Sequence, residues 1–120
     1  MTTASQSIRE TYVHDGFVFP IDAISEKEAR AVRVDLEAAE AELADDPEKL
    51  MLLRSYPDRL LPSFDKLIRN PNLIESVSPI LGTDLMVWSS GLFIKEANTS
   101  KVVTWHQDLN YWGLSELNQV

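Results

Sequence analysis

The chain contains no cysteine, and its 120 residues include only 2 histidines and 4 glycines. Without cysteine the chain forms no disulfide, holds no iron–sulfur cluster through thiolates and offers no thiol nucleophile, which suits a reducing compartment. Basic residues are also scarce, because 11 Lys and Arg face 19 Asp and Glu, giving a formal net charge of -8. Nucleic acids and anionic membranes attract clustered Lys and Arg, so neither is expected as a partner.

Long apolar runs are missing as well. Met1 to Ser7 lack the basic and apolar regions of a signal peptide. No apolar stretch approaches the roughly 20 residues that a transmembrane helix needs. We therefore expect a cytoplasmic protein without a membrane partner, and the length of 120 residues predicts a single domain with a modest core.

Local signals in the first two thirds of the chain predict helices. Ser25 and Glu28 have the spacing of a capping box, and an apolar stripe with helical period follows them. Asn70-Pro71 supplies a cap and a proline at the first helical position, and Gly82 supplies a stop. Helices are expected over residues 8–14, 25–46, 63–69 and 70–82, with Pro57 and Pro62 breaking any long element between them.

Some polar residues of this part need no functional explanation. Glu37, Glu40 and Glu42 fall largely off the apolar stripe and are interpreted as a solvated helix face. His14 precedes the Asp15-Gly16 turn and is interpreted as structural or solvent-facing.

Extended segments are expected elsewhere. Phe17-Val18-Phe19 predicts a short strand that ends at Pro20. From Asp84 onward the apolar period changes from helical to alternating, which predicts strands over residues 85–90, 92–96 and 102–105, with a turn at Asn98-Thr99-Ser100.

The third of these strands leads into the stretch with the most chemical content. On an extended backbone His106 and Asp108 project from one face, whereas Trp105 and Gln107 project from the other. One imidazole and one carboxylate in this arrangement form the sequence-adjacent part of a 2-His-1-carboxylate triad, which holds non-haem Fe(II) and leaves positions open for reactants.

The wider context resembles a known family. Trp105-His106-Gln107-Asp108, followed by Tyr111-Trp112 and preceded by Leu92-Phe93-Ile94-Lys95, resembles the phytanoyl-CoA dioxygenase family of Fe(II)/2-oxoglutarate oxygenases. Asp15-Gly16-Phe17-Val18 and the segment 71–82 are similar to that family's N-terminal part. The resemblance implies an α+β fold, with N-terminal helices and then the first strands of a double-stranded β-helix (jelly roll). Residues 1–120 would be one N-terminal fragment of a single oxygenase domain, with a helical part at about 8–82 and a strand part at about 84–120.

The resemblance also implies roles for individual residues. His106 and Asp108 would bind Fe(II), with 2-oxoglutarate and O2 as co-substrates and a small organic molecule as the substrate to be hydroxylated. Lys95 and Ser89 lie where the family places contacts to 2-oxoglutarate, although serine reaches less far than the glutamine that some relatives carry. Trp112 would share the face of the two ligands and contact the substrate. The acid at Asp108 favours hydroxylation over halogenation.

The ligand set is incomplete within this sequence. The resemblance calls for a distal histidine and for a basic residue that pairs with the far carboxylate of 2-oxoglutarate, both downstream of Asp108. The other histidine, His14, comes too early, and no arginine follows Arg69. We therefore expect an incomplete, truncated portion of a longer oxygenase that is inactive alone.

Other interpretations remain open. The chain would alternatively be a small acidic interaction module without catalytic function, whose Trp105, Tyr111 and Trp112 form an exposed aromatic patch for a partner. A hydrolytic zinc site would need further ligands. For single residues, a hydrogen-bonded structural role for His106 and a hydrated surface role for Lys95 are the simpler alternatives.

Overall fold

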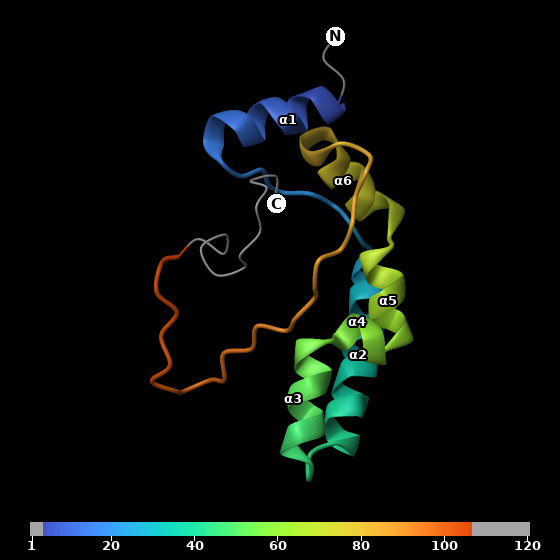
Figure 1. The fold of residues 1–120 in the computed structure, drawn as a ribbon, viewed down its shortest axis with the longest axis vertical. Helices are drawn as coiled ribbons and strands as arrows, with labels where there is room; N and C mark the ends of the chain where they lie inside the picture. The colour runs from blue at the N-terminus through green and yellow to red at the C-terminus, as the bar shows by residue number, and fades with distance from the viewer. Residues whose placement is uncertain (1–3, 107–120) are drawn as a thin grey trace.

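The computed structural model describes residues 4–106 of the chain. In this part, six helices lie between residues 4 and 81, and residues 82–106 form neither helix nor strand (Figure 1). The helices stack into an elongated body, and the segment that follows them first passes back along this body and then runs away from it.

Of the two N-terminal helices, the first ends and the second begins at its predicted signal, but the first starts at Ala4 instead of residue 8, and the second ends at Glu42, before the predicted stop at 45–47. Helix α1 (Ala4–Asp15) ends at Gly16, whose positive φ of 80° suits glycine and whose amide donates to the carbonyl of Tyr12 at 2.9 Å. Helix α2 (Glu26–Glu42) begins at a complete capping box. The Glu28 amide donates to Ser25 Oγ at 3.2 Å, and the Ser25 amide donates to Glu28 Oε2 at 2.9 Å, so two otherwise unpaired backbone groups are satisfied.

Three short helices occupy the stretch where the sequence signal is weak. They are α3 (Pro47–Ser55), α4 (Pro57–Leu60) and α5 (Pro62–Ile68), and each begins with proline. Proline suits the first helical position but disfavours helical geometry in the residue before it. The predicted breaks at Pro57 and Pro62 are therefore confirmed, although α3 and α4 themselves were not predicted.

Helix α6 (Pro71–Leu81) follows its predicted signals closely. The Asn70 side chain accepts from the Asn72 amide at 2.9 Å. Gly82, with a φ of 92°, donates its amide to Ser78 at 2.8 Å and ends the helix.

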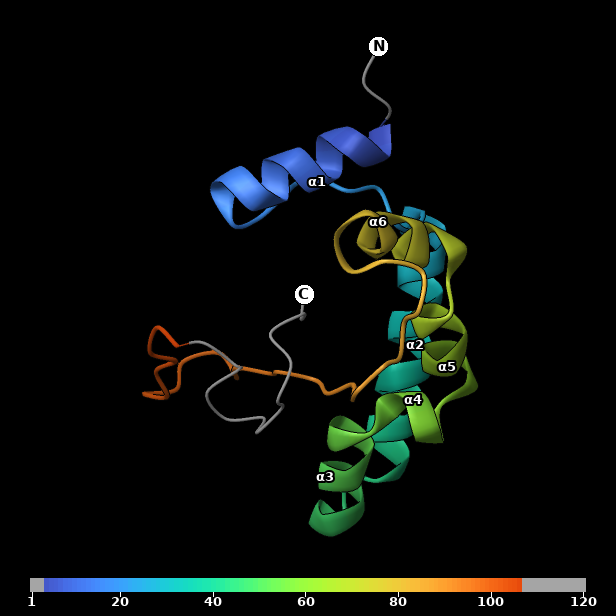
Figure 2. The ribbon, with the colours of Figure 1, turned by 45° about the horizontal axis from the view of Figure 1, so that its top comes forward.

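Some helices that are adjacent in sequence pack together, and so do two that are far apart, α1 and α6. Helix α1 lies across one end beside α6, whereas α5 contacts both α4 and α2, and α3 contacts α4 (Figure 2). The most deeply buried side chains of the described part are Leu53 and Pro57, each less than or close to 2% exposed. The deepest burial in the described part thus lies at the junction between α3 and α4.

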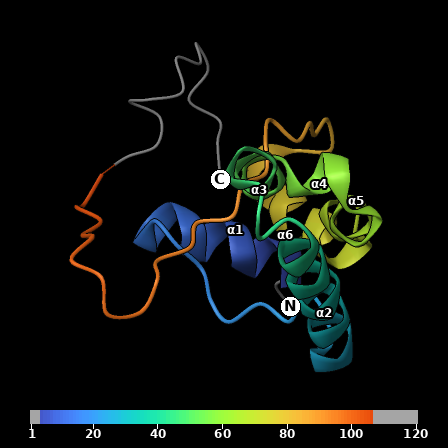
Figure 3. The same cartoon turned by 90° about the horizontal axis from the view of Figure 1, so that it is seen from below.

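The predicted strands are absent from the described residues, so the expectation of an α+β fold with the first strands of a jelly roll is wrong for this part of the chain. Residues 17–19, 85–90, 92–96 and 102–105 have no ladder partner, and the last three sets lie on one extended segment (Figure 3). Alternating apolar residues favour a strand, but a strand also needs a neighbouring backbone to bond with, which the pattern does not supply. Large apolar side chains remain exposed as a result, including Phe93 and Val102, each 80% exposed. The predicted turn at residues 98–100 is confirmed at its first residue, since Asn98 has a φ of 58°.

Candidate functional site

His106 is the predicted iron ligand whose position the structure describes. Its side chain is exposed, and its Nδ1 lies 2.7 Å from the carbonyl oxygen of Thr104. When Nδ1 carries the proton and donates to this carbonyl, the lone pair of the neutral imidazole is on Nε2. Histidines that bind metals through one nitrogen generally donate from the other to a carbonyl or carboxylate, so this contact is of the kind that prepares a ligand.

The rest of the predicted ligand face lies beyond the described part. Asp108 and Trp112 are outside the described residues, so their shared face with His106 stays a prediction. Among residues 4–106, no group of three or more His, Cys, Asp or Glu side chains is placed to hold a metal ion. The second histidine, His14, which was predicted to be structural or solvent-facing, is exposed, and its Nδ1 lies 2.5 Å from Asp15 Oδ1.

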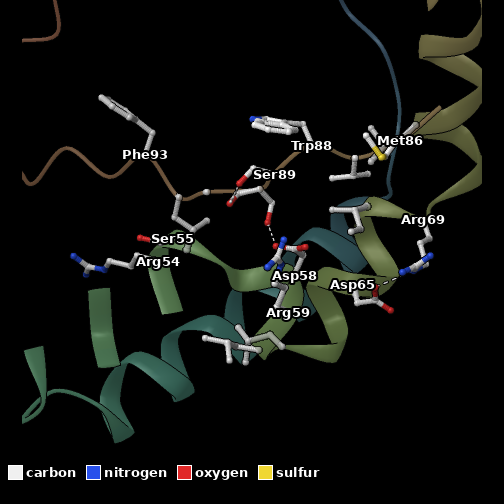
Figure 4. Close-up of a pocket in the computed structure, with 18 of the residues that line it drawn as sticks. Arg54, Ser55, Asp58, Arg59, Asp65, Arg69, Met86, Trp88, Ser89 and Phe93 are labelled. Atoms are coloured by element: carbon white, nitrogen blue, oxygen red, sulfur yellow. Dashed lines mark hydrogen bonds and ion pairs between the residues drawn. The ribbon is translucent and has the colours of Figure 1, made fainter. Parts of the chain in front are cut away.

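The two predicted co-substrate residues lie on the extended segment, and both are exposed. Ser89 lines a long groove between this segment and helices α3 to α6, and its hydroxyl donates to the Ser90 carbonyl at 3.3 Å (Figure 4). Lys95 lies two residues beyond Phe93, the last residue of the segment that lines the groove. Ser89 and Lys95 therefore belong to one stretch of backbone, and only Ser89 contributes to the groove wall.

The groove has apolar walls and a polar patch at the junction of α3 and α4. Its apolar side chains come from all four of the helices α3 to α6 and from the segment. At the junction the Ser90 hydroxyl donates to Asp58 Oδ1, and the guanidinium of Arg59 lies over the Tyr56 ring, 5.3 Å from its centroid. Farther along, Asp65 of α5 forms an ion pair of 2.9 Å with Arg69, the residue directly after that helix.

Arg54 is a residue of this site that the sequence reasoning missed. Its Nε donates to Glu40 Oε1 at 2.7 Å, and its Nη1 lies 3.5 Å from Glu96 Oε1. Glu40 is therefore only 24% exposed and does not belong to the solvated face assigned to it, whereas Glu37 and Glu42 are exposed as predicted. An arginine directly after the apolar run 50–53, and before a proline break, was the available signal.

Shifted pKa values in the described part belong to helix ends and surface pairs. The Ser25 hydroxyl and then the Ser25 amide lower the pKa of the Glu28 carboxyl. The Lys49 side chain and then its amide lower the pKa of Asp46, and Asp46 in turn raises the pKa of Lys49. These groups stabilise helices and lie apart from the predicted iron ligands.

No model of a known protein family matches this chain, and neither a curated protein nor a solved structure matches it. The resemblance to the phytanoyl-CoA dioxygenase family accordingly stays a prediction from the motif. None of the helices of the described part has the length and apolar character needed to cross a membrane.

Proposed function

We propose that this chain forms part of an Fe(II)- and 2-oxoglutarate-dependent oxygenase, in which His106 and Asp108 are two of the three protein ligands to iron. The observation that carries the proposal is the contact of 2.7 Å between His106 Nδ1 and the Thr104 carbonyl. It supports Nε2 as the ligand nitrogen and restrains the imidazole ring, as a metal site requires.

Among the described residues, the His106 imidazole is a nitrogen donor that suits Fe(II). A neutral imidazole suits ferrous iron, and a carboxylate two residues later would complete the adjacent pair. Iron, when bound, supplies the activation of O2, while the residues of this chain bind and orient. Among residues 4–106 no cluster of three His, Cys, Asp or Glu side chains is placed to hold a metal ion, so the third ligand is not assigned to a described residue.

The other predicted roles belong to the same proposal. Lys95 and Ser89 would contact 2-oxoglutarate, and Trp112 would contact a small organic substrate. Lys95 is exposed, so its ammonium group is accessible to a carboxylate of the co-substrate. We propose the cytoplasm as the compartment, because a chain without cysteine suits a reducing environment.

An anaerobic Fe(II) titration of the 120-residue chain, with and without 2-oxoglutarate, tests the proposal. We expect weak binding that 2-oxoglutarate strengthens, because its oxygens would add ligands to the iron, and binding coupling of this kind is reciprocal. His106→Ala should weaken Fe(II) binding at least about tenfold, whereas His14→Ala should leave it unchanged. Equal affinities in the wild type and His106→Ala would contradict the proposal.

A succinate assay in the same samples tests the expected incompleteness. With an incomplete ligand set, the chain alone should form no succinate from 2-oxoglutarate. Robust turnover would show that these residues already provide a complete site.

The exposed apolar residues of the extended segment favour a second candidate function, an interaction module. Trp105 is fully exposed and Met86 is 84% exposed, and large exposed apolar side chains mark surfaces that bind partners. The other members of the predicted patch, Tyr111 and Trp112, lie outside the described residues. Under this alternative, Fe(II) binding would not depend on His106, so the same titration separates the two functions.

A further inference from the structure

Three polar contacts fasten one stretch of the extended segment to the α3–α4 junction. The Leu92 amide donates to the Arg54 carbonyl at 2.7 Å, and the Ser90 hydroxyl donates to Asp58 Oδ1. The third contact is the ion pair of 3.5 Å between Arg54 Nη1 and Glu96 Oε1. Arg54 of α3 and Asp58 of α4 thus contact three residues within the stretch Ser90–Glu96.

The helical side of this attachment is firmly based. Leu53 and Pro57, the most buried residues of the described part, directly precede Arg54 and Asp58. The Arg54 guanidinium is further held by Glu40 of α2, at 2.7 Å. Because the anchoring groups have little freedom of their own, they transmit a defined position to the segment.

Each fastened end of the stretch adjoins a predicted co-substrate residue. Ser89 directly precedes Ser90, which is bonded to Asp58, and Lys95 directly precedes Glu96, which is paired with Arg54. Fixing the backbone at these two points limits where the neighbouring side chains can reach.

We infer that Arg54 and Asp58 are positioning residues that fix Ser89 and Lys95 for contact with 2-oxoglutarate. The identity of the ligand, 2-oxoglutarate, rests on the proposed function, whereas the attachment of the segment to the α3–α4 junction does not. It adds two residues to the site, neither of which lies near the His-x-Asp motif in sequence.

The attachment is measured by the exchange of the Leu92 amide in the 120-residue chain, followed by NMR. Asp58→Ala and Glu96→Ala should each speed this exchange about fivefold, the effect of losing one typical hydrogen bond. Asp58→Asn keeps an oxygen that accepts from Ser90 and should preserve the protection.

Two further variants serve as matched controls. Asp65→Ala removes a carboxylate that lines the same groove but pairs with Arg69, at the end of its own helix. Gly91→Ala adds a Cβ that meets the carbonyls of Arg54 and Ser55 at 4.0 Å, an ordinary contact. Both should leave the Leu92 exchange rate within about twofold of the wild type.

The positioning role is measured by the strengthening of Fe(II) binding that 2-oxoglutarate causes. Asp58→Ala should reduce this strengthening to the level of Lys95→Ala, and Asp58→Asn should restore it, while Fe(II) binding without 2-oxoglutarate stays unchanged. The positioning role would be overturned if Asp58→Ala speeds exchange of the Leu92 amide but leaves the effect of 2-oxoglutarate on Fe(II) binding unchanged. It would also be overturned if Asp58→Ala leaves the exchange rate unchanged. If 2-oxoglutarate has no effect on the wild type, the proposed function fails, and the exchange rates still decide whether Arg54 and Asp58 hold the segment.

Discussion

Arg54 Nε lies 2.7 Å from Glu40 Oε1, and this pair joins α3 to α2 across 14 residues of sequence. Both side chains are partly buried, at 34% and 24% exposure, so solvent screens the pair less than it screens a surface pair. The same guanidinium also reaches Glu96, which makes Arg54 a link between the helical body and the extended segment.

Glu40→Ala should therefore destabilise the chain by about 1–2 kcal/mol, because it leaves a partly buried guanidinium without its main partner. Urea denaturation followed by circular dichroism measures the change. Glu37→Ala is the control, since Glu37 pairs with Arg33 one helical turn away on the exposed face of α2. An equal loss for the two variants would show that burial does not distinguish the pairs.

Truncation of the buried side chain at the α3–α4 junction should have the largest effect on stability. Leu53 is 2% exposed, and Leu53→Ala should cost about 2–3 kcal/mol through lost burial and the cavity left behind. Met51, on the same helix and 62% exposed, provides the control variant Met51→Ala. Similar urea midpoints for both variants would be inconsistent with a core at this junction.

The capping box at the start of α2 predicts a loss of stability when its serine is replaced. Ser25→Ala removes the oxygen that accepts from the Glu28 amide and should cost about 1 kcal/mol, whereas Ser25→Asp should retain most of the stability. Helical circular dichroism during urea unfolding measures both. Ser55→Ala, at the exposed end of α3, should change little, and a comparable effect there would argue against a special role for the cap.

The lowered carboxyl pKa values predict a loss of stability in acid. In the folded chain the pKa of Glu28 lies below 4.5 and that of Asp46 below 3.8, their ordinary values. Their contributions are present above the ordinary values and are lost as the pH falls through the folded values, because protonation removes the favoured charged form. Urea midpoints between pH 7 and pH 2 should fall less steeply for Glu28→Gln with Asp46→Asn than for the wild type. Identical slopes would contradict the pKa assignment.

The capped helix ends were predictable because their signals lie within a few residues, whereas the start of α1, the end of α2, and helices α3 and α4 were not predicted. The Ser25 cap, the Asn70 cap and the Gly82 stop each depend on neighbours in sequence, and all three are present in the structure. The strands were predicted wrongly because a ladder depends on a second backbone, and alternation shows only which side chains prefer one face. Local sequence signals predict helix caps and side-chain periodicity, whereas a β-sheet also requires a second strand to pair with.

The candidate site was likewise predictable only where its signals lie close together in sequence. His106 was found from its spacing to Asp108, but its contact with the Thr104 carbonyl depends on the side-chain rotamer, which the motif does not encode. The role of Arg54 was missed because helical periodicity gives the apolar side of α2 and not the helix that packs there. Glu40 was consequently assigned to solvent, although it binds a residue 14 positions away.

The most direct test of iron binding at His106 uses the two histidines of the chain as probes of each other. Anaerobic Fe(II) is added to the chain while NMR follows the imidazole signals of His106 and His14. Bound Fe(II) is paramagnetic and broadens nearby signals, so the account predicts that His106 broadens first while His14 stays sharp. Broadening of His14 alone, equal broadening of both, or no broadening of His106 at saturating Fe(II) would contradict it.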